Sequence, residues 1–73
     1  MTDQVLRLIY PASLLSVPVI NQLIRRYDLT VNILRAQIGT DQGWLEVQLA
    51  GSSVVIEEAV SWLKEQGVEV QVK

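Results

Sequence analysis

The stretch TVNILRAQIGTDQGWLEVQLA, residues 30–50, decides the fold because it holds two strand patterns joined by a short turn. Its first part, from about Leu29 to Ile38, is rich in β-branched and apolar residues, which favour strands. Gly39 and Gly43 bracket the turn and can take the positive φ angles that hairpins use. In the segment WLEVQLA, residues 44–50, inward and outward positions alternate with the period of a strand. This stretch therefore predicts an antiparallel hairpin.

A further strand pattern lies at each end of the chain. QVLRLIY, residues 4–10, and VEVQVK, residues 68–73, both alternate with the period of two that a strand requires. Pro11 ends the first of these strands because proline has no N–H to donate. The sequence thus predicts four strands in all.

Two helix patterns lie between the hairpin and the first and last strands of the chain. The first helix is expected to have Ser16 as its N-cap, Pro18 in its first turn, and an end near Tyr27 or Asp28. Ser52 or Ser53 caps the second helix, and Gly67 is the glycine after its last turn. The spacing predicts two buried stripes, the first made of Ile20, Leu23, Ile24 and Tyr27 and the second of Ile56, Ala59, Val60 and Leu63.

The element order β-α-β-β-α-β predicts an α+β, ferredoxin-like sandwich. Right-handed crossovers place both helices on one face of a four-stranded antiparallel sheet with strand order 4-1-3-2. Simple alternation then places Asn32, Leu34, Ala36 and Ile38 on the face toward the helices. The same alternation predicts an apolar patch on the face without helices, formed by Val5, Ile9, Val31, Ile33 and Trp44. Because such patches usually mark an interface, we expect the domain to pair through this face or a strand edge.

Composition excludes several classes of function. Seventy-three residues make a single domain, residues 1–73, and the chain has neither cysteine nor histidine. We therefore expect no disulfide, no metal site, no cofactor and no catalytic residues, and hence no enzyme. A net charge of −2 disfavours nucleic acid as a partner. No apolar run reaches the roughly 20 residues of a membrane span, so we expect no insertion into a membrane and a cytoplasmic location.

The segments TVNILRAQIG and VPVINQLIRRY together resemble the NIL domain, a ferredoxin-like module that takes its name from the tripeptide found here as Asn32-Ile33-Leu34. The likeness covers nearly the whole chain. It implies a regulatory domain similar to the amino-acid-sensing ACT domain, as found at the C-terminus of the ATPases of methionine ABC importers. There it pairs with a second copy and binds methionine near the domain–domain interface.

The sequence departs from the larger members of this family. It has no Walker A loop, so it is not the importer ATPase itself, and without cysteine it carries no iron–sulfur cluster. Met1 and the short lead-in Thr2-Asp3 favour a free-standing protein. We expect a non-catalytic sensor for a small amino acid, with methionine as the family precedent. The alternative is an adaptor that binds another protein and no small molecule.

Asn32 is the residue on which the sensor hypothesis depends. An amide offers two donors and an acceptor, which suit the carboxylate and ammonium groups of an amino acid. Ile33, Leu34 and Ile38 could then form the apolar wall for its side chain. A structural explanation stays open at this point, because asparagine also bonds to nearby backbone at the start of a strand.

Overall fold

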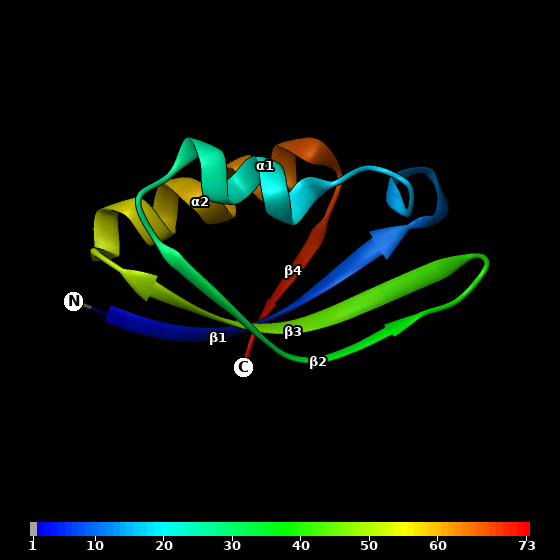
Figure 1. The fold of residues 1–73 in the computed structure, drawn as a ribbon, viewed down its shortest axis with the longest axis horizontal. Coiled ribbons are helices and arrows are strands. Elements are labelled where there is room, and N and C mark those ends of the chain that lie inside the picture. Colours follow the sequence, from blue (N-terminus) through cyan, green and yellow to red (C-terminus); the bar gives the residue numbers. More distant parts are fainter. Residues whose placement is uncertain (1) are drawn as a thin grey trace.

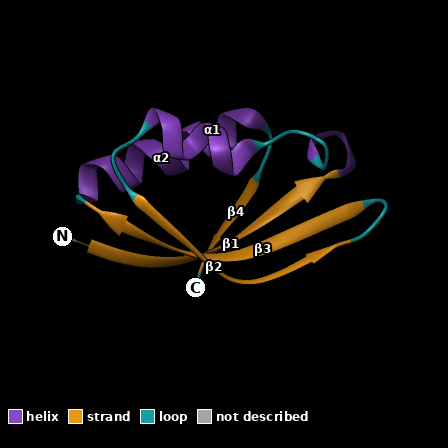
Figure 2. Cartoon of the chain, viewed as in Figure 1, coloured by secondary structure: helices purple, strands orange, loops and turns teal. Residues whose placement is uncertain are grey.

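Two layers make up the fold: a four-stranded antiparallel sheet and a pair of helices on one of its faces (Figures 1 and 2). The computed structural model describes residues 2–73. Its elements in chain order are β1 (Thr2–Pro11), a 3₁₀ turn η1 (Ala12–Leu14), α1 (Val19–Arg26), β2 (Thr30–Ile38), β3 (Gln42–Gly51), α2 (Ser53–Gln66) and β4 (Glu69–Val72). The strand order is β2-β3-β1-β4, which confirms the predicted order 4-1-3-2 read from the other side.

The core lies between the sheet and the two helices. The two central strands contribute alternate residues to it, with Leu6 and Leu8 on β1 and Val47 and Leu49 on β3 fully buried. Helix residues close the core from above, as expected for Leu23, Ile56, Ala59 and Leu63. Burying each large aliphatic side chain contributes about 1.5–3 kcal/mol, so this layer supplies most of the driving force for folding.

Both ends of helix α2 have the caps that the sequence predicts, Ser52 and Gly67. The Ser52 hydroxyl accepts a hydrogen bond from the backbone N–H of Val55 at 3.2 Å. At the other end Gly67 has φ of 101°, and the N–H groups of Gly67 and Val68 donate to the carbonyls of Lys64 and Leu63. This pair of bonds is the Schellman motif, which satisfies carbonyls that the helix itself cannot pair.

The prediction for the start of α1 was wrong. Ser16 is not its N-cap, because the helix begins at Val19 with Pro18 at the cap position and without a side-chain cap. The buried stripe shifts accordingly and includes Val19 with Leu23, whereas Ile24 stays 48% exposed. Proline fixes its own φ and lacks an N–H, so the chain can turn into helical conformation directly after it.

A β-bulge in β2 overturns the predicted facing of half that strand. Ile33 pairs with Val47 and Arg35 pairs with Glu46, so Leu34 is an extra residue without an opposite partner. Opposed residues in an antiparallel pair share a face, and an extra residue switches the alternation. Val31 and Ile33 therefore lie on the helix-facing side, and Asn32 lies on the open face, opposite Gln48. For the residues after the bulge, Arg35 to Ile38, the predicted facing is confirmed.

We predict that Gly67→Ala destabilises the protein by about 1–2 kcal/mol, the usual cost of a left-handed conformation for a residue with a Cβ. Space is not the reason, since the nearest atom to a Cβ at this position is Leu14 Cδ1 at an ordinary 3.6 Å. Chemical denaturation measures the loss. Gly67→Asn is the matched control and should recover part of the stability, because asparagine tolerates this conformation; equal stability of the Ala variant and the parent would contradict the assignment.

Candidate functional site

The outer edge of β2 is the most exposed regular element of the domain. This strand pairs only with β3, and among residues 2–73 no strand pairs with its other edge. Eight of its nine residues are exposed, Val31 being the half-buried exception. The side chains of Ile33, Leu34 and Ile38 are 52%, 47% and 61% exposed. Sheet edges with such apolar side chains are ready to accept another chain.

The predicted ligand-binding residues share this edge but do not share a face. Asn32 lies on the open face, Leu34 lies in the bulge, and Ile33 and Ile38 lie on the side toward the helices. Within residues 2–73 no hydrogen bond involves the Asn32 side chain. The structure therefore gives no support to a purely local role in which this amide bonds to nearby backbone.

The centre of the open face is a polar cluster around Glu46. This carboxylate is 5% exposed, and it is covered by Arg7 of β1, Arg35 of β2 and Lys73, which follows β4. Arg7 Nη2 and Lys73 Nζ lie 3.3 Å and 3.2 Å from Oε2, and the Arg35 guanidinium donates to Oε1. The hydrogen bond from Arg35, together with that from Lys73 and their charges, outweighs burial and lowers the pKa of Glu46 to about 2.

Trp44 holds the two arginines of this cluster in place. The Arg7 guanidinium carbon lies 4.5 Å from the centre of the Trp44 ring, and that of Arg35 lies 5.7 Å away. Cations at these distances are attracted by the ring face. Both arginines therefore have partners within the chain, in the Trp44 ring and the Glu46 carboxylate.

The predicted apolar patch on the open face was wrong in its extent. Val31 and Ile33 are absent from that face because of the bulge, which leaves Val5, Ile9 and Trp44, all half-buried. The adjacent apolar pair Ile33-Leu34 is the one sequence signal of the bulge, and nothing in the sequence showed that Glu46 would be nearly inaccessible. Three of the six exposed large apolar residues of the described chain, Ile33, Leu34 and Ile38, lie on β2, and none lies on the open face.

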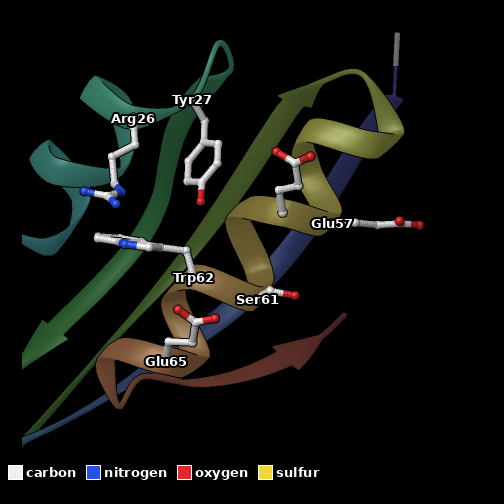
Figure 3. Close-up of a pocket in the computed structure, with 7 residues that line it drawn as sticks. Arg26, Tyr27, Glu57, Ser61, Trp62 and Glu65 are labelled. Atoms are coloured by element: carbon white, nitrogen blue, oxygen red, sulfur yellow. The ribbon is translucent and has the colours of Figure 1, made fainter.

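A second feature is a hollow on the outside of the helix layer, of about 540 Å³ (Figure 3). Figure 3 shows Arg26 lying over the ring of Trp62, with Tyr27 beside them. The guanidinium carbon of Arg26 is 5.3 Å from the ring centre, and the Tyr27 and Trp62 rings meet edge to face at 6.5 Å. Trp62 is 7% exposed and belongs to the hydrophobic core. The rest of the lining is acidic or small: Glu57, Glu58, Ser61 and Glu65.

No candidate metal site lies among the described residues. Within residues 2–73 no group of three acidic, histidine or cysteine side chains could hold a metal ion. In the same part of the chain, neither helix is long and apolar enough to cross a bilayer. The arrangement offers an unpaired strand edge and polar surfaces, which are features of a binding module.

Two helices on one face of a β2-β3-β1-β4 sheet define the class of ferredoxin-like domains. Within this class the chain belongs to the NIL domain family, whose pattern it matches over residues 4–72. This finding confirms the resemblance based on Asn32-Ile33-Leu34 and its surroundings.

Relatives of two kinds share the sequence. The methionine import ATP-binding protein MetN 1 of Paraburkholderia xenovorans is 38% identical over an alignment of 74 positions, which covers 96% of this chain and 22% of that protein. The chain thus spans about a fifth of the length of such relatives. The protein ssr2439 of Synechocystis is 37% identical over an alignment of 71 positions, which covers 94% of this chain and 73% of that protein.

A solved structure shares the fold. The C-terminal domain of an ABC transporter ATP-binding protein from Enterococcus faecalis superimposes with a TM-score of 0.83 at 26% identity, and it covers 94% of this chain and 81% of that one. The sandwich of this chain is thus a fold that the C-terminal domain of an ABC transporter ATP-binding protein also adopts.

We predict that the Glu46 cluster makes stability depend on pH in a defined window. The folded-state pKa lies near 2 and the ordinary value is 4.5. A depressed pKa stabilises the folded state above about pH 4.5, and this contribution disappears as the pH falls toward 2. The difference in melting temperature between the parent and Glu46→Gln should therefore be largest near neutral pH and shrink across this window.

Glu57→Gln is the control for this experiment, because Glu57 is an exposed carboxylate without an ion pair among the described residues. Its melting temperature should follow that of the parent across the same pH range. A Glu46→Gln variant that keeps a constant offset from the parent between pH 7 and pH 2 would contradict the role given to this carboxylate.

Proposed function

We propose that this chain is a non-catalytic regulatory domain that binds a small amino acid at the edge of β2, where a second copy pairs with it. The observation that supports the proposal is the exposed edge itself: Asn32, Ile33, Leu34 and Ile38 lie along a strand whose outer side no other described strand covers. Regulatory roles also fit the family, whose relatives include ATPases named for methionine import.

Methionine suits the chemistry of this edge. Its carboxylate and ammonium groups need donors and acceptors, and the Asn32 amide supplies both. Its thioether chain is apolar and flexible, and it would lie against half-exposed aliphatic side chains such as Leu34. An open strand edge encloses such a ligand only poorly, so a second copy would complete the walls. The ligand would then act by favouring the paired state over the single domain.

We expect L-methionine to give a calorimetric binding signal with the parent protein and a dissociation constant about tenfold to a hundredfold weaker with Asn32→Ala, because hydrogen bonds to charged groups contribute about 1.5–3 kcal/mol. Asn21→Ala, at an exposed position on α1, is the matched control and should bind as the parent does. The absence of heat at millimolar methionine, together with unchanged amide signals around Asn32, would reject methionine as the ligand.

Pairing through the edge has its own prediction. Ile33→Glu should weaken self-association by roughly thirtyfold or more, since two half-buried isoleucines of a symmetric pair contribute about 2 kcal/mol. Light scattering over a range of concentrations measures the mass. Val54→Glu is the matched control, because Val54 is a 61% exposed aliphatic residue on α2. A parent protein that stays monomeric at high concentration would reject pairing with a second copy.

The adaptor alternative rests on the same edge and differs in the occupant. An extended segment of another protein could add a strand to β2 through main-chain hydrogen bonds. A monomeric parent that binds no amino acid, and that binds a partner lost on Ile33→Glu, would favour this alternative.

A further inference from the structure

In the Glu46 cluster the negative charge is buried and the positive charges are more exposed. The Glu46 side chain is 6% exposed, whereas the side chains of Arg7, Arg35 and Lys73 are 29%, 64% and 44% exposed. The single negative charge thus lies beneath three positive ones. A partner that approaches the open face meets cations first, even though each cation has an internal counter-ion.

The cluster also concentrates the chain's positive charge. Three of the six basic residues and one of the eight acidic residues gather here, which gives a local net charge of +2 in a chain whose net charge is −2. Asp3 and Glu69 also lie on the open face, but neither is in register with Glu46: Asp3 is opposite Ala50, and Glu69 is opposite Ile9. The positive area is therefore local and bounded by negative charge.

Two of the cations, Arg7 and Arg35, have contacts within the sheet before any partner binds. Arg7 on β1 and Arg35 on β2 are both in register with Glu46 on β3, which lies between them. The backbones of the two arginines are therefore two strand spacings, or about 10 Å, apart. Their contacts with Trp44 and Glu46 restrict both side chains. Each guanidinium has five N–H donors, and Glu46 occupies only some of them. A fixed arginine with free donors binds a carboxylate at low entropic cost.

We propose that the open face around Trp44 and the Glu46 cluster is a docking surface for an acidic segment of another protein. This surface adjoins the β2 edge of the proposed function, since Arg35 lies on β2 and Asn32 is on the same face, but its other polar groups come from β1, β3 and the chain after β4. The small size of the positive area fits two or three carboxylates. Nucleic acid is disfavoured because its phosphates continue beyond the cluster, where the rest of the chain is negative.

The test uses the full chain, labelled with ¹⁵N, and hexaglutamate as the probe. Titration in low salt should shift the amide signals of Trp44, Glu46 and Arg35 and the Trp44 indole signal, and leave those of the helix layer in place. Affinity should fall as salt rises from about 10 to about 150 mM, because screening weakens exposed charge pairs. Hexaglutamine, which lacks the charge, should give no shift.

Three variants that each remove one positive charge distinguish this surface from a general charge effect. Arg35→Gln and Lys73→Gln should each weaken hexaglutamate binding about two- to fivefold, the range for one exposed ion pair. Arg25→Gln, at an exposed position on α1, should bind as the parent does. Unchanged core signals in each spectrum exclude unfolding as the cause.

Several results would overturn the proposal. These are the absence of shifts in low salt, equal weakening by all three variants, or shifts confined to the helices. Tighter binding of a hexathymidine oligonucleotide than of hexaglutamate would assign the face to nucleic acid. Self-association that Arg35→Gln abolishes and Ile33→Glu does not would assign it to a second copy. Failure of methionine to bind would leave this surface unaffected, because none of its readouts involves that ligand.

Discussion

A carboxylate on β3 is the constraint around which the uncovered face of this sheet is organised. Glu46 is nearly inaccessible, and a charge in such a position needs partners of opposite charge. The three cations that surround it come from β1, from β2 and from the end of the chain after β4. One side chain thereby links all four strands on the side where no helix packs, and the face can meet water without an apolar cover.

The two sides of the sheet are stabilised by different interactions. Toward the helices, Leu6, Leu8, Val47 and Leu49 exclude water completely. On the other side, ion pairs and cation–π contacts replace aliphatic packing. This division explains how a chain of 73 residues, without cysteine, forms one sheet with a single covering layer. The domain thus has two exposed surfaces of different character: the apolar edge of β2, and the charged face of the sheet on the side without helices.

Much of the fold could be predicted from the sequence, because local signals and the global topology agree. Alternation in β1 and β3, the Ser52 cap and the Gly67 turn each specify an element, and right-handed crossovers leave one arrangement of them. The bulge could not be predicted in this way. The adjacent apolar residues Ile33 and Leu34 interrupt the alternation, but only the pairing with β3 shows that Leu34 is the residue without a partner.

The extra residue Leu34 accounts for most of the difference between the predicted and the observed candidate site. Because of this residue, Asn32 lies on the open face, and Val31 and Ile33 lie on the side toward the helices. The residues of the expected apolar patch, and those of the expected ligand site, therefore do not share one face. The Glu46 cluster was missed for another reason. Its members are far apart in the sequence, and only strand register brings Arg7, Arg35 and Lys73 together.

The bulge also bears on solubility. A long, flat edge with exposed aliphatic residues is a template for cross-β stacking, in which identical strands add without limit. The extra residue at Leu34 interrupts the even spacing of hydrogen-bonding groups along β2, so a straight strand cannot match its whole length. Fibril growth is thereby discouraged, while a partner shaped to fit the irregularity can still be accepted.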